Sequence, residues 1–311
     1  MKKIQLSNGL IVSSLALGAM NFGTTTPKDE AFKILDTYLD FGGNFIDTSN
    51  NYAHWQGTGD ESETVLGEWI KSSGKRKDIV LATKVGFDRH GEGAGLKKEQ
   101  IEFWVDQSLR KLQTDYIDLY YAHTDDMNTP IEETLEAFDN LVKKGKVRNL
   151  GASNFDTWRI AESNMLAKNK GQTPYTVVQQ KFSYLTPKFG VAPKYIFNEH
   201  VNRERLRFLK DKNIPLVAYS CLCKGGYENV SRLPSDYELS GRYQAIKDIA
   251  KEKDLSVSAM VLLYLMSLHK LENYPQIIPL FSSSEKHIIE NLRSTQFELD
   301  VEEIQFLNNV E

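Results

Sequence analysis

Short strand-like runs alternate with helix-like stretches along almost the whole of this 311-residue chain. Each run is rich in apolar residues and is bounded by turn residues, as expected of a buried strand. The stretches between the runs repeat apolar residues at helical spacing, and several place acidic residues early and basic residues late, as the helix dipole favours. This alternation predicts repeated βα units around a parallel sheet. The eight runs are 15–18, 44–48, 78–84, 116–122, 147–153, 176–180, 215–220 and 276–280.

Eight parallel strands can form an open doubly wound sheet or a closed barrel. The count and the even spacing favour the closed (β/α)8 TIM barrel, which needs about 250 residues. No GxGxxG motif follows the first run, so the usual sign of a Rossmann domain is missing. No linker rich in Pro, Ser or Gly divides the sequence, and we therefore expect residues 1–311 to form a single barrel domain.

The first 14 residues contain two β-prone runs on either side of Asn8-Gly9. Asn-Gly is the commonest signal for a two-residue hairpin turn. The sequence therefore predicts an N-terminal β-hairpin in front of the barrel.

Composition argues against several classes of function. A formal net charge of -4 and a pI near 6.0 argue against a nucleic-acid partner, which usually requires a basic face. No run approaches the roughly 18 consecutive apolar residues of a membrane helix, and no continuous apolar segment follows Lys2 and Lys3 as in a signal peptide. We therefore expect a cytoplasmic protein with no membrane partner. The two cysteines, Cys221 and Cys223, are too close together for a structural staple and too few for a zinc site.

Reactive side chains collect where the active site of such a barrel lies, at the C-terminal ends of the strands. Asp47, Tyr52, Lys84 and His123 follow three consecutive strand runs. Neighbouring strands lie about 4.8 Å apart, so the four side chains can reach one pocket. Each alone has a structural explanation, such as a turn residue or a core histidine. Together they are harder to explain in that way, because burying Asp and Lys is costly unless they pair.

The chemistry that suits these four side chains is general acid catalysis by a phenol. A free tyrosine has a pKa of about 10, and we expect the Lys84 cation to lower the pKa of Tyr52 while Asp47 holds Lys84 in place. His123 would orient a substrate carbonyl and donate a hydrogen bond to its oxygen. Reduction of a carbonyl requires hydride, which no side chain supplies, so a nicotinamide cofactor is implied.

In these residues and in their order the chain resembles the aldo-keto reductase superfamily over nearly its whole length. The resemblance implies a barrel with an N-terminal hairpin, a catalytic tetrad of Asp47, Tyr52, Lys84 and His123, and NADPH-dependent reduction of aldehydes and ketones. The segments that carry the resemblance are LALGAMNFG, FIDTSNNY, LATKVG, YYAHTDD, GKVRNLGASNF, VAYS and IIENL.

The resemblance also implies a set of cofactor-binding residues. Ser153, Asn154 and Gln179 would hold the nicotinamide carboxamide, and Tyr219 would stack on the nicotinamide ring. Ser220 and Leu222 would lead toward the pyrophosphate, and Glu290 and Asn291 would contact the adenine. The family often has an acidic residue two places after this glutamine, but Lys181 stands there in this chain. The register of the motif is therefore open, and Gln180 is the alternative to Gln179. The implied residues are Ser153, Asn154, Gln179, Tyr219, Ser220, Leu222, Glu290 and Asn291.

The segment expected to hold the 2′-phosphate of NADPH departs from the family pattern. Leu280 and Ser282 stand where basic residues are common, and an apparent one-residue insertion leaves Lys286 or His287 for that role. Serines 282–284 together with the backbone N–H groups at a helix start form an alternative anion site. NADPH is the expected cofactor, and NADH stays open as the alternative.

Apolar residues just past the strand ends predict the lining of a substrate pocket. The expected substrate residues are Met20, His54 and Trp55, with Phe22, Phe87 and Trp158 as further candidates. The chain ends about 20 residues after Asn291, and most of that tail reads as helix. We therefore expect a relatively open pocket that accepts aldehydes, ketones or sugar-like carbonyls.

Two other functions stay open. A redox-sensing module resembling the channel β-subunits of this superfamily would keep the barrel and the cofactor but serve a partner protein. A barrel lyase or aldolase would use Lys84 as a Schiff base, although pairing with Asp47 would keep that lysine protonated. The sequence does not indicate an oligomeric state.

Overall fold

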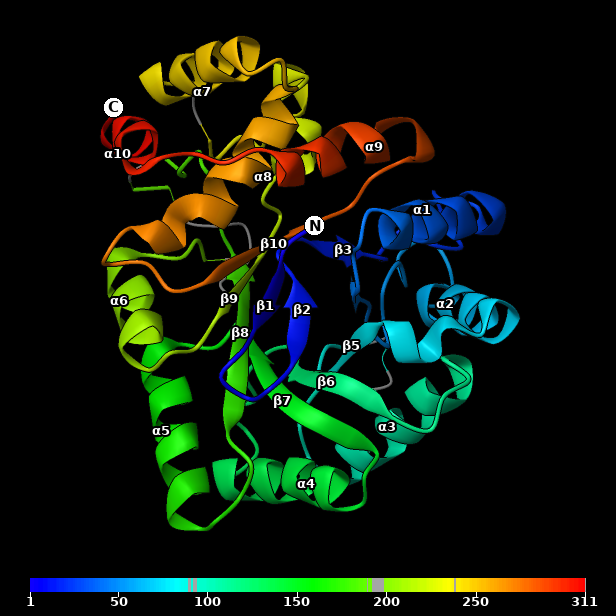
Figure 1. Cartoon of the computed structure of the whole chain (residues 1–311). Coiled ribbons are helices and arrows are strands. Elements are labelled where there is room, and N and C mark those ends of the chain that lie inside the picture. Colours follow the sequence, from blue (N-terminus) through cyan, green and yellow to red (C-terminus); the bar gives the residue numbers. More distant parts are fainter. Residues whose placement is uncertain (89–90, 92–93, 189, 192–198, 238, 311) are drawn as a thin grey trace.

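The computed structural model describes residues 1–88, 91, 94–188, 190–191, 199–237 and 239–310. Eight parallel strands form a closed barrel in the order β10-β3-β4-β5-β6-β7-β8-β9, with helices around it (Figure 1). This confirms the predicted fold class, and each predicted run overlaps an observed strand to within two residues at either end. The barrel strands are β3 (Ala16–Gly18), β4 (Phe45–Asp47), β5 (Val80–Val85), β6 (Ile117–Ala122), β7 (Val147–Ser153), β8 (Tyr175–Lys181), β9 (Leu216–Tyr219) and β10 (Ile277–Phe281).

The helices pack an apolar face against the outside of the barrel. In α4, for example, Leu135, Phe138 and Leu141 are buried at helical spacing. Helix α8 is mostly apolar on all sides and is buried from Ser258 to Ser267, because it lies among α7, α9 and β10. Within the described ranges, no helix is long and apolar enough to cross a membrane.

The helices are α1 (Lys28–Asp40), α2 (Glu61–Ser73), α3 (Lys98–Lys111), α4 (Ile131–Lys143), α5 (Thr157–Asn169), α6 (Arg203–Asp211), α7 (Gly241–Glu252), α8 (Val257–Ser267), α9 (Glu285–Arg293) and α10 (Val301–Asn309).

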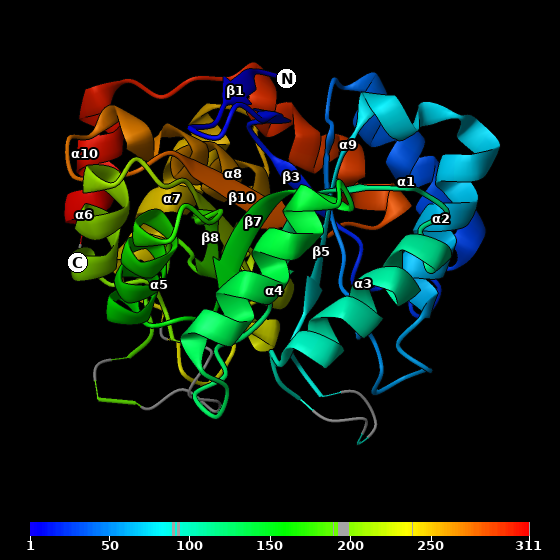
Figure 2. The same ribbon diagram turned by 90° about the horizontal axis from the view of Figure 1, so that it is seen from below.

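The N-terminal hairpin of β1 (Lys3–Gln5) and β2 (Ile11–Ser13) covers one end of the barrel. It is bonded to the starts of barrel strands: Ser13 N donates to Asn44 Oδ1 at 2.6 Å, just before β4. The hairpin therefore closes the N-terminal end of the barrel and leaves the C-terminal end open. Figure 2 shows the hairpin on one side of the barrel and the long connecting loops on the other.

The hairpin is confirmed, but the predicted two-residue turn is wrong. Leu6 N donates to Leu10 O at 2.8 Å, which leaves residues 7–9 as a three-residue loop. Gly9 occupies the left-handed region with φ of 85°, where glycine carries no steric penalty. Three-residue hairpin loops also commonly place a residue in this conformation, so Asn-Gly is compatible with both loop lengths.

Helices α2 and α3 approach each other closely at Gly67. A Cβ atom added there would lie 1.9 Å from the backbone oxygen of Lys111 and 2.9 Å from the backbone of Leu112. Backbone atoms cannot move aside as the end of a flexible side chain can, so the two helices would have to separate.

We predict that Gly67→Ala lowers the free energy of unfolding by about 2–3 kcal/mol, the upper part of the range for overpacking a core. Urea unfolding followed by circular dichroism measures this change. Ser72→Ala, at an exposed position of the same helix, is the matched control and should change stability by less than about 0.5 kcal/mol. Equal stability of wild type and Gly67→Ala would contradict the close packing.

Candidate active site

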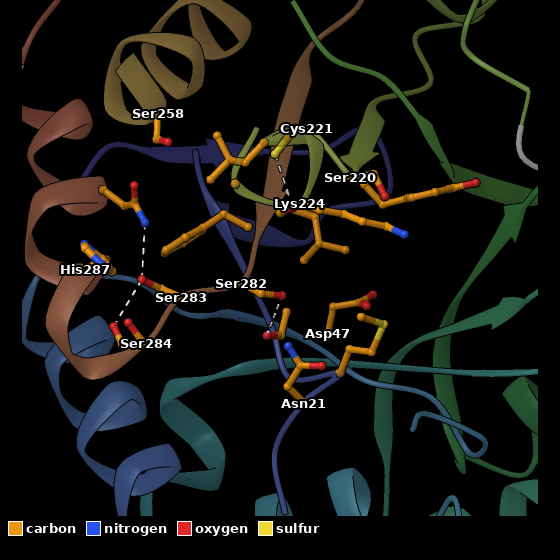
Figure 3. Close-up of a pocket in the computed structure, with 18 of the residues that line it drawn as sticks. Asn21, Asp47, Ser220, Cys221, Lys224, Ser258, Ser282, Ser283, Ser284 and His287 are labelled. Atoms are coloured by element: carbon orange, nitrogen blue, oxygen red, sulfur yellow. Dashed lines mark hydrogen bonds between the residues drawn. The ribbon is translucent and has the colours of Figure 1, made fainter. Parts of the chain in front are cut away.

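A cleft with a volume of about 730 Å³ opens at the C-terminal end of the barrel. Figure 3 shows Asp47 toward one end of it and Ser283, Ser284 and His287 toward the other. Residues from the ends of strands far apart in the sequence therefore surround one elongated space. The predicted site residues that line it are Met20, Asp47, Tyr52, His123, Ser153, Asn154, Gln179, Tyr219, Ser220, Leu222, His287, Glu290 and Asn291.

Lys84 forms a buried ion pair with Asp47 beneath the cleft. Asp47 ends β4 and Lys84 is the last residue but one of the neighbouring β5, and both side chains are 0% exposed. Lys84 Nζ donates to Asp47 Oδ1, and also to the backbone oxygen of Thr48 at 2.7 Å and to the Tyr52 hydroxyl at 2.7 Å. Burial lowers the pKa of Lys84, and the Asp47 carboxylate opposes that shift. All three ammonium donors thus have partners, as a buried charge requires.

Tyr52 lies between this ion pair and the cleft. Its hydroxyl accepts the hydrogen bond from Lys84 and donates to Asp47 Oδ1 at 3.3 Å. Burial raises the pKa of Tyr52 well above its ordinary value, and the negative charge of Asp47 adds to the rise. The pKa of Tyr52 is therefore raised rather than lowered as predicted, because burial and the Asp47 carboxylate outweigh the stabilisation that the Lys84 ammonium can give the phenolate. Tyr52 is a neutral phenol that holds a proton.

His123 follows β6 directly and presents a neutral imidazole to the cleft. Burial, with a contribution from the Lys84 charge, lowers the pKa of His123 well below its ordinary value. Ring contacts hold it in place: the centroid of Phe87 lies 4.5 Å away and that of Tyr52 5.8 Å away, both nearly edge-on. Nδ1 lies 3.1 Å from the hydroxyl of Ser49, a residue that the sequence analysis did not single out.

Gln179 joins the far side of the cleft to Asp47. Its Nε2 donates to Asp47 Oδ2 at 2.8 Å, so both carboxylate oxygens accept hydrogen bonds. Gln180, the alternative considered from the sequence, does not belong to the described lining, and its Nε2 donates to the Glu199 backbone oxygen at 2.8 Å. Of the two glutamines, Gln179 is the one at the cleft.

Asn154 links three strand ends around the cleft. Its Nδ2 donates to the His123 backbone oxygen at 2.8 Å, and its Oδ1 accepts from the Tyr219 hydroxyl at 2.7 Å. Asn154 has a φ of 58°, in the left-handed region that asparagine tolerates better than most residues. The hydrogen bonds hold Tyr219 and His123 in fixed relative positions.

The opposite end of the cleft is suited to bind an anion. Helix α9 begins there, with Ser284 as the residue before its first turn, and Ser283 Oγ accepts from Asn291 Nδ2 at 3.2 Å. His287 lines the cleft, with Nδ1 3.6 Å from the Glu290 carboxylate. Lys286 is exposed and does not belong to the described lining. Of the two candidates from the sequence, the structure places His287 at the cleft.

Two cations, Lys224 and Arg232, also line the cleft, from the loop after β9. Neither forms an ion pair with any residue that the structure describes. Lys224 takes a left-handed φ of 57°, and Figure 3 shows its side chain among those that line the cleft. The sequence analysis missed both, because this loop has no periodicity and its basic residues look like ordinary surface residues.

The predicted apolar mouth is only partly at the cleft. Met20 and Phe87 line it. Trp55 is 58% exposed and packs edge-on against His54, and neither belongs to the described lining. Substrate contact by this pair stays a prediction. The other two candidates also lie elsewhere: Phe22 is buried in the core and Trp158 is largely exposed.

Comparison with known proteins gives a consistent set of relatives. Residues 14–311 match the Aldo/keto reductase family. The norsolorinic acid reductase stcV of Emericella nidulans is 32% identical, over 95% of this chain and 77% of its own length. The aldo-keto reductase ausK of Aspergillus calidoustus is 30% identical, over 97% and 79%. An aryl-alcohol dehydrogenase of Phanerodontia chrysosporium, with NADP(+) in its name, is 28% identical, over 97% and 83%.

We predict that breaking the Asp47–Lys84 pair destabilises the fold more than removing both charges does. Asp47→Asn and Lys84→Met each leave a buried charge without its partner, which costs about 3–5 kcal/mol. The double variant should lose less stability than either single variant, because no uncompensated charge is left.

Urea unfolding of wild type, the two single variants and the double variant measures the coupling between the two side chains. Lys71→Met, at an exposed position of α2, controls for the loss of a lysine and should change stability by less than about 0.5 kcal/mol. Additive losses in the double variant would show that the two side chains are not coupled.

Proposed function

The chain belongs to the aldo/keto reductase family, and we propose that it is an NADPH-dependent reductase of aldehydes and ketones in which Tyr52 donates the proton. Relatives named as reductases and dehydrogenases support an oxidoreductase that acts on small carbonyl compounds. The observation that carries the proposal is the Tyr52 hydroxyl, which lies at the cleft and is hydrogen-bonded to the buried Lys84.

The geometry supports Tyr52 as a proton donor rather than a base. When a carbonyl is reduced, negative charge develops on its oxygen, and a neutral phenol can supply a proton to it. The phenolate that results has the Lys84 ammonium 2.7 Å away. Lys84 therefore acts after proton transfer begins, by stabilising the charge left on Tyr52. In the resting site the same lysine is neutralised by Asp47.

The remaining tetrad residue, His123, suits the binding and orientation of the carbonyl. Its ring is neutral and lines the cleft. A neutral imidazole with an N–H directed into the cleft would hydrogen-bond the carbonyl oxygen and strengthen that bond as charge develops. The oxygen would then have two donors, Tyr52 and His123.

The side chains of the cleft fit a nicotinamide dinucleotide. Ser153, Asn154 and Gln179 line the cleft with polar groups, which we assign to the carboxamide, and we assign the aromatic ring of Tyr219 to the face of the nicotinamide. When bound, the nicotinamide supplies the hydride that no side chain provides. Toward the other end, Ser220 and Leu222 lead to the pyrophosphate position.

The anion-binding end supports NADPH as the cofactor. We assign Lys224 and Arg232 to the diphosphate, and we assign His287 with the N-terminus of α9 to the 2′-phosphate, because helix N-termini favour anions. Glu290 and Asn291 would then contact the adenine. The relative with NADP(+) in its name supports this choice over NADH.

The substrate class follows from the wall near Tyr52. Phe87, Met20 and the tetrad rings form an apolar and aromatic surface beside the proton donor. One relative is named for aryl alcohols. We therefore propose aromatic aldehydes and ketones as the preferred substrates, with sugar-like carbonyls as the contrasting class in a substrate panel.

The two alternative functions make different demands on the site. A Schiff-base lyase needs an accessible Lys84, yet this lysine is 0% exposed, paired with Asp47 and outside the described lining of the cleft. Borohydride trapping of a carbonyl adduct on Lys84 would favour that chemistry. A redox-sensing module would bind NADPH tightly, reduce no carbonyl in a broad panel and retain a protein partner in a pull-down.

We predict that Tyr52→Phe lowers kcat for a test aldehyde by about 10²–10⁴-fold, the usual contribution of general acid catalysis. The ring and its packing are retained, so NADPH affinity in a fluorescence titration should stay within about twofold of wild type. Tyr243→Phe, which removes a hydroxyl bonded to Tyr227 O outside the cleft, is the control and should keep full activity. Undiminished turnover by Tyr52→Phe would remove Tyr52 from the mechanism.

We predict that His287→Ala weakens NADPH binding about tenfold and leaves NADH binding unchanged, because a charge-assisted hydrogen bond contributes about 1.5–3 kcal/mol. Lys224→Ala should weaken both cofactors, since both contain the diphosphate. Lys286→Ala, which changes the exposed neighbour of His287, is the control and should alter neither. Fluorescence titrations with each cofactor measure the affinities, and equal losses for NADPH and NADH in His287→Ala would contradict the assignment.

A further inference from the structure

Ser49 is a buried hydroxyl beside the catalytic tetrad that the mechanism above does not use. It follows β4, is 0% exposed, and lies 3.1 Å from His123 Nδ1 and 2.9 Å from the side-chain amide of Asn51. We propose that Ser49, supported by Asn51, donates its proton to His123 Nδ1 and thereby places the ring proton on Nε2, where it faces the substrate carbonyl. This positioning role rests on the proposed function of His123.

The argument begins from the number of ring protons. A neutral imidazole carries one N–H, and the other nitrogen is an acceptor. The partner of Nδ1 is the Ser49 hydroxyl, whereas Nε2 makes no hydrogen bond to the residues described. If Ser49 donates to Nδ1, then Nε2 holds the proton and can bind a carbonyl oxygen. If Ser49 accepts from Nδ1, then Nε2 presents a lone pair, which repels that oxygen.

Asn51 decides which way the Ser49 proton points, because a serine hydroxyl has a single proton to donate. With Asn51 Oδ1 toward Ser49, the hydroxyl donates to Asn51 and His123 must carry its proton on Nδ1. Turning the amide by half a rotation places its NH₂ group in the same position. That group donates to Ser49 Oγ and leaves the serine proton for His123 Nδ1.

Little holds the Asn51 amide in the first orientation. There, Asn51 Nδ2 lies 3.5 Å from the Asp88 backbone oxygen, a distance beyond that of a well-formed N–H···O bond. The two orientations of an amide have nearly the same shape, so the hydrogen-bond network determines which is adopted. We infer the second orientation from the proposed function of His123, which requires a donor at Nε2.

The His123 ring itself has little freedom to adjust. Phe87 and Tyr52 contact it nearly edge-on, and its backbone oxygen accepts from Asn154. With the ring held in this way, the position of its proton is the property left for Ser49 to set. A different tautomer would change the chemistry at Nε2 without moving the ring.

Ring nitrogen chemical shifts test the proposal directly. In ¹⁵N–¹H correlation spectra of the full chain, the His123 signals are assigned by their loss in His123→Asn. Wild type is expected to have a protonated Nε2 and an unprotonated Nδ1. Asn51→Asp replaces the amide by a carboxylate, which only accepts, so Ser49 must donate to it and the proton should move to Nδ1 of His123. Ser49→Ala should give a mixture of the two tautomers.

Ser62→Ala is the matched control. Ser62 is another fully buried hydroxyl near the site, but it bonds to the Thr48 hydroxyl and to the Ala19 backbone oxygen. Its removal should leave the His123 tautomer as in wild type. Circular dichroism of each variant verifies that the fold is retained.

Kinetics then test the consequence for the reaction. Asn51→Asp should lower kcat for an aromatic aldehyde about 100-fold, since losing one hydrogen-bond donor to a developing oxyanion costs roughly 10²–10³-fold. NADPH affinity should be unchanged. Three results would overturn the proposal. Wild type could carry the ring proton on Nδ1, the proton could stay on Nε2 in Asn51→Asp, or that variant could keep full activity although its proton has moved. Because the tautomer is read without turnover, a wild type that reduces no carbonyl would refute the proposed function separately.

Discussion

The buried charge of Asp47 is the constraint on which the rest of the site depends. A carboxylate with no exposed surface is tolerated only when its oxygens accept hydrogen bonds from suitable donors. Lys84 and Tyr52 donate to one oxygen and Gln179 to the other. These partners come from the ends of β5 and β8 and from the loop after β4, so satisfying one charge aligns three parts of the barrel rim.

This arrangement separates two roles of Lys84. In the resting site its charge is balanced by Asp47, and burial keeps the proton on Tyr52. In the proposed mechanism Tyr52 then gives up that proton, and the same ammonium is already at hydrogen-bond distance from the resulting phenolate. Nothing has to move to stabilise the new charge, which is the advantage of a preorganised polar site. The rigid barrel supplies that preorganisation, because its strands fix where each side chain begins.

Much of the fold was predictable from the pattern of residues. Each barrel strand is a short apolar run between turn residues, and the helices repeat apolar residues at helical spacing. The meeting of the four proposed tetrad residues was predictable for a related reason: reactive side chains at successive strand ends converge in a barrel. The local sequence was not sufficient to predict loop lengths or the positions of side chains in loops. Asn8-Gly9 is compatible with two loop lengths, and His54 and Trp55 pack against each other beside the site. Lys224 and Arg232 lie in a loop with no pattern to indicate where their side chains lie.

The order of strands and helices, the closed barrel and the meeting of Asp47, Tyr52, Lys84 and His123 at one end of it are therefore already contained in the amino-acid sequence, since each follows from short-range periodicity and the geometry of parallel strands. The protonation state of Tyr52, the choice of Gln179 over Gln180 and the contact of Ser49 with His123 depended on the tertiary structure. Asp47 and Gln179 are 132 residues apart, and Ser49 and His123 are 74 apart. Electrostatic balance and hydrogen bonding depend on distances of a few ångströms between such residues, which folding alone establishes.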